Sequence, residues 1–311
     1  MVAIRRGSTN ATIQEVIIPA AVYDGGYSRA KEVRLRISNG GAGQSGLIGA
    51  FANAYIKFCV QKKGIDPFQV AWYLGDTTQS LHYLASSLVD VACTYNAAAE
   101  QQSMNSGAAV QRELIFLDHF YLVGPPKNPA HLSSRNDSVL DMFNKIVVSG
   151  NEDAVRPPDP NIRPTTRFLS RYDKSATNIK ESELFIKIGQ VPWAYAYSTW
   201  YHQYARFPLQ ALEAASLLAE YTLTDRGTWL STTPLVRDNL VVYKGAEGEG
   251  EDVLLNPCNA LLASKTLDGE IAGGFMDWVV HQDGGQQVVR DFRKNGEQLY
   301  TARPKTDRLA S

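Results

Sequence analysis

The feature that most constrains this fold is a repeated alternation of strand-like and helix-like segments. Val33–Ser38 alternates apolar and polar residues, which is the period of a half-buried strand. A glycine-rich turn over residues 39–46 follows it, and a helical pattern then runs from Leu47 to about Lys62. Two further strand–helix pairs are predicted over residues 70–87 and 89–105. Such alternation is typical of an α/β chain with a mostly parallel sheet flanked by helices.

A second block of the same kind follows a Gly-Pro-Pro turn at residues 124–126. Just before this turn the sequence predicts two short strands, over residues 114–117 and 120–123. The remaining expected elements, in chain order, are an amphipathic helix over 139–146, an irregular Pro- and Asp-rich loop over 151–166, a strand over 167–170, a helix from about 173 to 188, a helix over 208–221, a strand over 240–243, an acidic glycine-rich run over 245–252, a strand over 260–263 and helices over 270–282 and 286–292. A length of 311 residues fits two domains.

Charge and cysteine content exclude several classes of protein. The 31 Lys and Arg residues nearly balance the 32 Asp and Glu residues, which argues against nucleic-acid binding and against a polybasic membrane anchor. No apolar run reaches about 18 residues, so no membrane-spanning helix is expected. The three cysteines (Cys59, Cys93 and Cys258) are far apart, so neither a disulfide framework nor a cysteine-rich metal site is expected.

No catalytic signature is present. The five histidines show no metal-binding spacing, and GxSxG, kinase and zinc-deaminase motifs are missing. Cys59 and Cys93 lie in apolar runs and are expected to be buried, unreactive thiols. Asp76 is the one plausible general base. We therefore expect no enzyme, no cofactor and no metal site.

Two segments have the composition of an anion site. In the first, over Gly40–Gly46, successive glycines let backbone N–H groups converge ahead of a helix, although a plain tight turn explains the glycines equally well. In the second, over Ser170–Thr177, Arg171 ends a strand and hydroxyl residues precede a helix. An anion there would meet the guanidinium, the Ser175 and Thr177 hydroxyls and helix N–H groups, while the alternative is an ordinary capped helix with a surface arginine.

The first residues lack the apolar stretch of a secretory signal. This predicts a cytoplasmic protein, with a mature periplasmic or secreted form as the alternative. An aromatic stretch over Trp193–Tyr204 could line a ligand cleft, or it could pack between lobes.

The order of motifs resembles the TupA-like tungstate-binding proteins, which are solute receptors of ABC importers. Residues 220–229 (EYTLTDRGTW) are similar to the family pattern AYTLTDRGTY, and residues 168–177 (FLSRYDKSAT) to FVSRGDxSGT. Residues 118–125 (DHFYLVGP), 90–100 (DVACTYNAAAE), 255–257 (LNP) and 275–278 (FMDW) resemble further family blocks in the same order.

The resemblance implies a type II periplasmic-binding-protein-like fold, with two α/β lobes, a ligand cleft and two crossover hinge strands. The implied domains are an N-terminal extension over residues 1–30, a discontinuous first lobe over 31–121 and 254–311, and a second lobe over 122–253. The hinge is expected near Phe120–Gly124 and Leu254–Ala260, where bending would close the lobes on a ligand.

The resemblance also implies a set of ligand-binding residues. Arg171 and Thr177 match family oxyanion ligands, with Ser175 beside them, and Asn96 falls where the family has a small or hydroxyl residue. The binding loops depart from the family: Ser38, Asn39, Gly40 and Ser45 replace a threonine-rich loop. Thr77 is kept beside the new Asp76, and Arg206 stands where the family is glycine-rich.

The resulting expectation is a binding protein for a small anion, most simply a tetrahedral oxyanion such as tungstate or molybdate. Arg206 and the aromatic stretch favour, as the alternative, an organic anion such as a carboxylate or a phosphorylated metabolite. A metabolic enzyme built on the same fold is the third reading. No nucleic acid and no membrane insertion are expected, and an ABC permease would be a partner only if the protein is exported.

Overall fold

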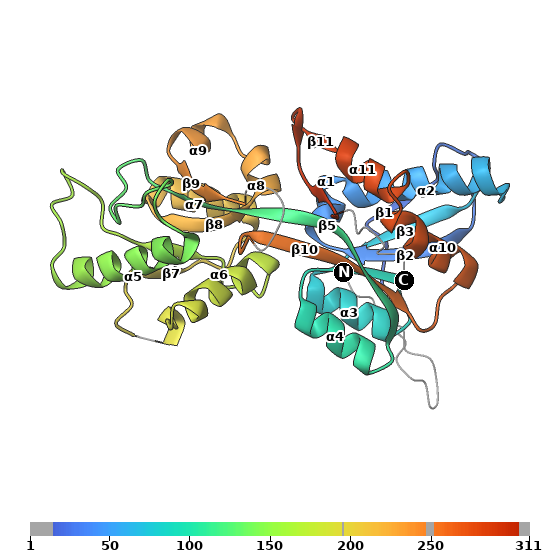
Figure 1. Cartoon of the computed structure of the whole chain (residues 1–311), viewed down its shortest axis with the longest axis horizontal. Coiled ribbons are helices and arrows are strands. Elements are labelled where there is room, and N and C mark those ends of the chain that lie inside the picture. The colour runs from blue at the N-terminus through green and yellow to red at the C-terminus, as the bar shows by residue number, and fades with distance from the viewer. Residues whose placement is uncertain (1–14, 195, 247–251, 305–311) are drawn as a thin grey trace, which may run out of the picture. The chain divides into compact units, whose positions relative to one another are not determined.

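The computed structural model describes residues 15–194, 196–246 and 252–304, and these fold into two compact units. The first unit contains the chain up to Leu117, Pro257–Arg293 and the chain from Tyr300. The second contains Asp118–Asn256 and Lys294–Leu299 (Figure 1). The sequence predicts boundaries between the two lobes at 121/122 and at 253/254. The structure changes units a few residues away from these positions and adds residues 294–299 to the second unit.

The first unit is built on a mixed sheet. Its central strands are β2 (Val33–Asn39), β3 (Gln69–Leu74) and β4 (Val91–Thr94), with β2 parallel to both of the others. β1 (Ala21–Tyr23) is antiparallel to β3, and β10 (Leu255–Ala263) is antiparallel to β4. The prediction of a mostly parallel sheet is therefore correct for β2, β3 and β4 and wrong for β1 and β10, which are antiparallel to their neighbours.

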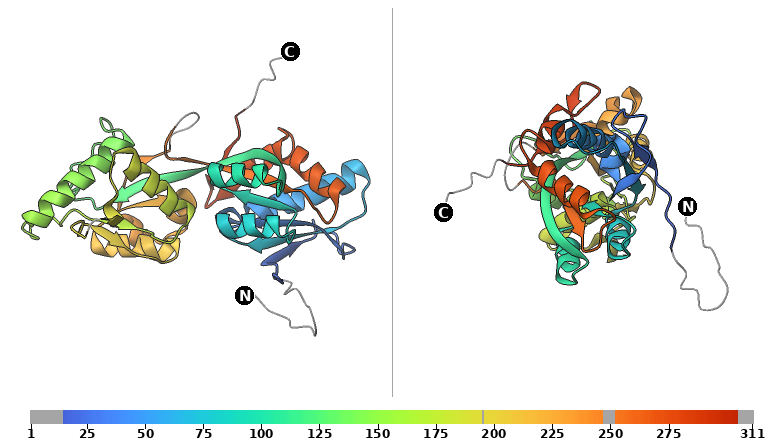
Figure 2. Two further views of the ribbon diagram at one scale, coloured as in Figure 1. Left: turned by 90° about the horizontal axis from the view of Figure 1, so that it is seen from below. Right: turned by 90° about the vertical axis from the view of Figure 1, so that its right-hand side faces the viewer.

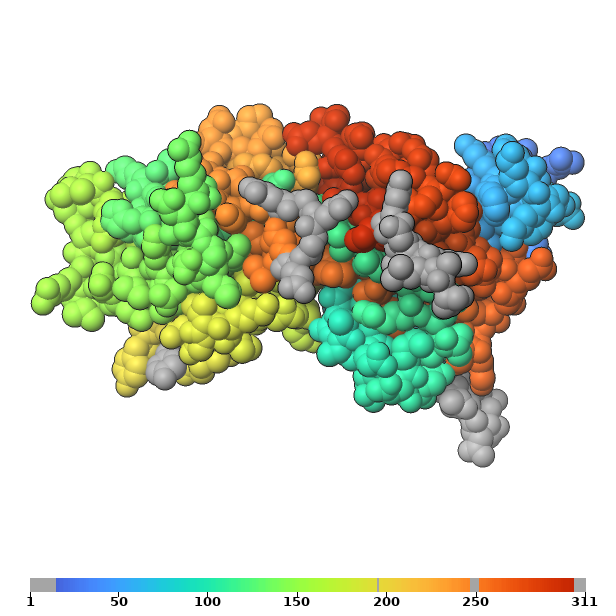
Figure 3. All heavy atoms as spheres, viewed as in Figure 1, coloured from blue at the N-terminus to red at the C-terminus, as the bar shows by residue number. Residues whose placement is uncertain are grey.

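Helices cover both faces of this sheet (Figure 1). On one side α2 (Leu47–Lys63), α10 (Gly269–Val280) and α11 (Gly285–Asp291) pack against one another. On the other side α3 (Thr77–Ala85) and α4 (Ala97–Asn105) form a pair. Residues from the N-terminal and C-terminal thirds of the chain form the surface of this unit together (Figure 3).

The second unit has a sheet centred on β6 (Phe168–Ser170), which lies parallel to both β7 (Tyr201–Gln203) and β8 (Tyr221–Asp225). The long strand β5 (Ala109–Gly124) is antiparallel to β8 and to β9 (Val241–Gly245). The alternation of side chains along β6 separates two cores. Phe168 packs with α5 (Val139–Val155) and α6 (Ala176–Lys187), whereas Leu169 packs with α7 (Pro208–Leu218).

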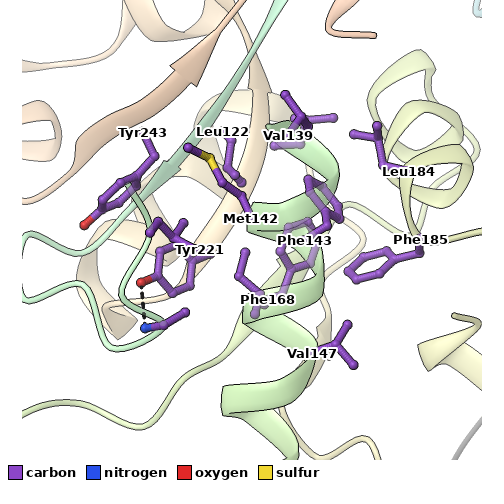
Figure 4. Packing of buried hydrophobic residues seen from close by; sticks show 14 of the residues in the cluster. Leu122, Val139, Met142, Phe143, Val147, Phe168, Leu184, Phe185, Tyr221 and Tyr243 are labelled. Carbon is purple, nitrogen blue, oxygen red and sulfur yellow. Dashed lines mark hydrogen bonds between the residues drawn. The ribbon is translucent and has the colours of Figure 1, made fainter. Parts of the chain in front are cut away.

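The larger of these cores is aromatic. Phe168 lies 5.6 Å from Phe143 of α5 and 5.1 Å from Phe185 of α6, measured between ring centroids, and all three rings are fully buried (Figure 4). The helices α5 and α6 lie side by side over this face (Figure 2). The short helices α8 (Arg226–Ser231) and α9 (Pro234–Asp238) pack against α7.

Several predicted elements differ in extent from the observed ones. The two strands predicted over 114–123 are a single strand, because the polar Asp118–His119 pair does not interrupt the ladder: Phe120 N–H donates to Leu254 O at 2.9 Å. The loop predicted from residue 151 begins after Val155, since α5 continues that far. The predicted N-terminal extension contains β1, which belongs to the first sheet. No helix among the described residues is long and apolar enough to cross a membrane.

Candidate functional site

In the first unit the carboxyl ends of β2, β3 and β4 meet at one edge of the sheet, and a helix starts after each strand. Gly75 N–H donates to Asn39 O at 3.3 Å, which joins the loops after β2 and β3. Tyr95 N–H donates to the Thr77 hydroxyl at 3.4 Å, which joins the loops after β3 and β4. The structure therefore brings Ser38, Asn39, Gly40, Thr77 and Asn96 to the same edge.

Two of these residues are buried and already paired. The Ser38 hydroxyl lies 2.8 Å from the Ser80 hydroxyl. The Asn39 side chain donates to Cys93 O at 2.7 Å and accepts from Gly43 N–H at 2.8 Å. Both residues are fully buried, so in this structure they hold the loops together.

The predicted glycine loop is a short helix, α1 (Gly41–Ser45), and not an open anion cradle. The Asn39 amide fixes its first turn, and the indole N–H of Trp72 donates to Asn39 O at 3.0 Å. Gly43 lies against the Trp72 ring so closely that a Cβ would come within 2.2 Å of it. Ser45 lies at the far end of α1, bonded to Ala42 O and to the Tyr300 hydroxyl, both at 2.9 Å.

Thr77 and Asn96 lie at the starts of α3 and α4. Asp76 and Gln79 form a reciprocal cap on α3, and the Asn96 side chain accepts from Ala99 N–H at 3.0 Å. The caps bond the third N–H of each helix, so the first two N–H groups of α3 and α4 remain directed along the helix axes toward this edge. Asp76, expected as a possible general base, is engaged as a helix cap.

In the second unit Arg171 directly follows β6 and is only 5% exposed. One guanidinium nitrogen, Nη2, binds the Asp173 carboxylate, whereas Nε is buried and has no hydrogen-bond partner among the described residues. Ser175 caps α6 by accepting from Asn178 N–H at 3.3 Å. Thr177, in the first turn of α6, is 6% exposed. The predicted group of Arg171, Ser175 and Thr177 is therefore assembled within one loop and one helix start.

The backbone of this loop is unusual. Tyr172 and Lys174 have φ angles of 45° and 62°, in the left-handed region that side-chain-bearing residues adopt only at a cost. Such a conformation persists where neighbouring contacts fix it. Here Ser175 N–H donates to Asp173 Oδ1 at 3.0 Å, and Lys174 N–H donates to Asn178 Oδ1 at 3.1 Å.

Sequence reasoning missed the residues beneath the loop. The Ser170 hydroxyl binds the Glu181 carboxyl and accepts from the Tyr201 hydroxyl at 2.8 Å. Burial raises the pKa of Glu181 to about 8, although Arg171 lowers it. A signal was available: Thr177, Glu181, Leu184 and Phe185 are spaced i, i+4, i+7 and i+8, which places the carboxyl group on the buried face of α6.

Arg206 is exposed, and its Nη1 donates to Ala205 O at 2.9 Å. It follows β7, whose end is joined to that of β6 by a bond of 2.9 Å from Tyr204 N–H to Ser170 O. Arg206 is therefore near the same edge of the second sheet as Arg171, and its guanidinium is bonded within its own loop, to Ala205 O.

Three residues of the aromatic stretch, Trp193, Trp200 and Tyr201, pack inside the second unit, whereas Tyr197 is exposed. Trp200 and Tyr201 are buried, and their ring centroids lie 6.0 and 5.9 Å from that of Phe185. Trp193 packs against the same core. The expectation of an aromatic ligand wall is wrong for these residues, because they complete the core between β7 and α6.

The cysteines of the described part of the chain are free thiols, and all three are buried. Cys59 and Cys93 are buried as predicted, and burial raises the pKa of Cys93 to about 12. Within residues 15–194, 196–246 and 252–304, no group of three or more His, Cys, Asp or Glu residues could hold a metal ion.

Two α/β units, with β5 and β10 running from one into the other, define a bilobal binding-protein architecture. The family model described as a PBP superfamily domain matches residues 9–283. The chain belongs to this family, and the predicted fold class is confirmed.

Known proteins similar to this chain include two curated sequences. A candidate ABC transporter anion-binding protein of Haloferax volcanii is 26% identical over 68% of this chain, and the match spans only 56% of that protein's length. A tungstate-binding protein, TupA, of Peptoclostridium acidaminophilum is 25% identical over 72% of both chains. A crystal structure described as a periplasmic, candidate metal-binding protein is 49% identical, with a TM-score of 0.82 over 91% of this chain and 99% of that one. The resemblance to tungstate-binding proteins is thus confirmed.

These relatives correct the predicted cytoplasmic location, which is wrong. The Haloferax volcanii relative is named as an ABC transporter protein, and the 49% identical crystal structure is described as periplasmic. Nothing in the comparisons supports a cytoplasmic member.

Proposed function

We propose that the protein is a solute-binding protein for a small oxyanion, with tungstate and molybdate as the leading candidates. The observation that carries the proposal is Arg171: a buried guanidinium at a helix start, with one nitrogen bound to Asp173 and Nε without a partner. A buried donor without an acceptor is costly, so an arriving anion would satisfy it. Ser175, Thr177 and the first N–H groups of α6 would supply neutral donors.

The first unit offers a second set of neutral donors. The first N–H groups of α3 and α4, together with Thr77 and Asn96, lie at one edge of its sheet. Ser38, Asn39 and Gly40 shape this edge through their own bonds, and Ser45 lies farther away, at the end of α1. Helix N-termini of this kind favour negative charge.

The relatives support a transport role without catalysis. We propose that the protein acts outside the cytoplasm and delivers its anion to an ABC permease, as the name of the Haloferax volcanii relative and the description of the 49% identical structure suggest. Asp76, the one general base that the sequence offers, accepts from Gln79 N–H as the cap of α3. The similar protein described as metal-binding is compatible with this reading, because tungstate and molybdate are themselves metal oxyanions.

Thermal melting against a panel of ligands, combined with native mass spectrometry of freshly purified protein, tests the proposal. Tungstate or molybdate at millimolar concentration should raise the melting temperature, since a ligand that binds only the folded state stabilises it. A shift with organic carboxylates or sugar phosphates alone would favour the organic-anion reading. A rise of the melting temperature with divalent cations alone, or no rise with any ligand, would contradict the proposal.

A further inference from the structure

We propose that Glu181 is a positioning residue of the Arg171 site and that tight anion binding requires its carboxyl group to be protonated. The inference rests on the proposed function, because it concerns the affinity for that anion. It adds a pH dependence whose source is a residue outside the predicted ligand set.

Glu181 lies under the loop, on the buried face of α6, and is 0% exposed. Its Oε1 binds the Ser170 hydroxyl and accepts from Asn178 Nδ2 at 2.7 Å. Its Oε2 is buried without a hydrogen-bond partner in the described part of the chain. A carboxylate with one bare oxygen is costly to ionise in such surroundings, so the neutral form is favoured.

Ser170 connects Glu181 to the loop that carries Arg171. Its hydroxyl accepts from Tyr172 N–H at 3.2 Å and from the Tyr201 hydroxyl at 2.8 Å. Tyr172 is one of the two residues held in the left-handed region, and it directly follows Arg171. The Glu181–Ser170 pair therefore helps to fix the backbone that aims the guanidinium.

The ionisable groups around Glu181 come from several elements. The loop contributes Arg171, which lowers its pKa, and Asp173, which raises it. From β7, the Tyr201 hydroxyl is bonded to Ser170. From β8, the Tyr221 side chain enters the same core, but its hydroxyl is bonded to Asn128 at 2.9 Å and to Ala130 N–H at 3.1 Å. The nearby face of α5 is apolar, with Met142, Phe143 and Ile146.

Burial is the largest of these influences and raises the pKa of Glu181 to about 8. Below that pH, Arg171 faces an anion without a buried negative charge behind it. Above it, an ionised Glu181 would repel the anion and compete for the guanidinium. An anion bound at Arg171 would raise the same pKa further, so binding above pH 8 takes up a proton.

Glu100 of the first unit is also a fully buried carboxyl group on a helix, but its surroundings differ from those of Glu181. Its two oxygens accept from four groups: Thr94 Oγ1 at 2.8 Å, Asn96 N–H at 3.0 Å, Arg112 Nε at 2.8 Å and Asn259 Nδ2 at 2.9 Å. Glu100 has an arginine bonded directly to it, whereas Glu181 has only neutral partners. The two carboxyl groups therefore differ in the charge and number of their hydrogen-bond partners.

The test measures the dissociation constant for tungstate between pH 6.5 and 9.5, where tungstate remains a dianion. For the wild-type protein we expect a constant affinity up to about pH 7.5 and an affinity weaker by roughly tenfold or more at pH 9.5. This size of change is possible because linkage to one proton lets the affinity fall by up to about tenfold per pH unit above the pKa. Glu181→Gln cannot ionise, and its amide oxygen can still accept from Ser170 and Asn178, so its profile should be flat. Glu183→Gln, on the exposed side of the same helix, should keep the wild-type profile.

Two results would overturn the role of Glu181 alone. In the first, Glu181→Gln binds tungstate as tightly as the wild-type protein and with the same pH profile. In the second, Glu181→Gln is folded but does not bind tungstate at any pH. No binding of tungstate by the wild-type protein at any pH would overturn the proposed function as well. If Glu181→Gln does not fold, calorimetry of the wild-type protein at pH 8.5, in buffers of different ionisation enthalpy, decides. Clear proton uptake, of up to about three quarters of a proton per tungstate at this pH, supports the inference, and none overturns it.

Discussion

Arg171 combines two properties that are rarely found together in a surface arginine. It is 5% exposed, and its charge is only partly matched, by the Asp173 carboxylate through one nitrogen. Asp173 itself keeps 24% of its side chain exposed, so it can be solvated if an anion takes over the guanidinium. At the scale of single residues, these two properties are the reason that we propose Arg171 as the principal anion-binding group.

Arg171→Ala should therefore weaken tungstate binding by roughly a hundredfold or more, because it removes a charge-assisted contact worth a few kcal/mol. Arg171→Lys should also bind poorly, since a point charge does not reproduce the planar fork. Arg206→Ala, which removes an exposed guanidinium, is the matched control and should change affinity only slightly. Equilibrium dialysis measures the affinities, and circular dichroism checks the folds. Normal binding by Arg171→Ala with loss in Arg206→Ala would contradict the assignment.

The raised pKa of Glu181 also predicts that the stability of the protein depends on pH. Its pKa is about 8 in the folded protein, above the ordinary value of 4.5, so its stabilising contribution is complete below pH 4.5 and is lost as the pH rises toward 8. Glu181→Gln has no ionisable group at this position, so its stability does not contain this pH-dependent contribution. The free energy of unfolding of the wild-type protein, relative to the variant, should fall by on the order of 4 kcal/mol between pH 4.5 and pH 8.5. Urea unfolding at the two pH values measures it, and a difference that does not change with pH would refute the shift.

At the scale of elements, both candidate surfaces are formed by the N-terminal ends of helices that follow parallel strands. The short helix α1 shows how closely the first of them is packed. Gly43 has no room for a Cβ beside the Trp72 ring, whereas a Cβ on Gly41 would meet no atom within 4 Å. The two glycines belong to the same five-residue helix, so they form a matched pair.

Gly43→Ala should lower the free energy of unfolding by roughly 1–3 kcal/mol, because the ring of Trp72 must move and its bond to Asn39 O is disturbed. Gly41→Ala should be neutral or slightly stabilising, because alanine restricts the unfolded chain. Thermal or urea unfolding of both variants makes the comparison. Equal stability of the two would show that α1 is not packed on β3 as described.

The elements themselves could be predicted where periodicity was clear. The alternation at Val33–Ser38 and the strand–helix pairs after it were recognised because each apolar period matches its element. The glycines predict a turn at Gly41–Ser45, because glycine is a poor helix former, whereas the structure has a short helix there. The Asn39 amide and the Trp72 ring stabilise the helix through contacts that the sequence alone does not reveal.

The candidate site was predictable only in part. Arg171, Ser175 and Thr177 are adjacent in sequence, so their grouping at one helix start follows from local structure. Glu181 was missed because a glutamate in a helix is most often solvated, and its burial depends on Phe168 and Tyr201 from other strands. Trp200 and Tyr201 were considered for a ligand wall because aromatic composition does not distinguish a core from a cleft.

At the scale of the whole molecule, β5 and β10 are strands shared by the two units, and the chain changes units at 117/118 and 256/257 within them. The hinge predicted near Phe120–Gly124 and Leu254–Ala260 stays a prediction. Small-angle scattering with saturating tungstate should show a smaller radius of gyration than scattering without it, since ligand-driven hinge bending brings domains together. Coinciding curves, from a sample shown to bind tungstate, would rule out the hinge motion.

The central claim is that this chain binds a small oxyanion, and isothermal titration calorimetry tests it most directly. Wild-type protein at pH 7 is titrated separately with tungstate, molybdate, sulfate and phosphate. The account predicts one-to-one binding of tungstate or molybdate with a dissociation constant of about 1 µM or lower, which corresponds to about 8 kcal/mol of binding free energy. No heat and no melting shift with any of the four anions at millimolar concentration would contradict it.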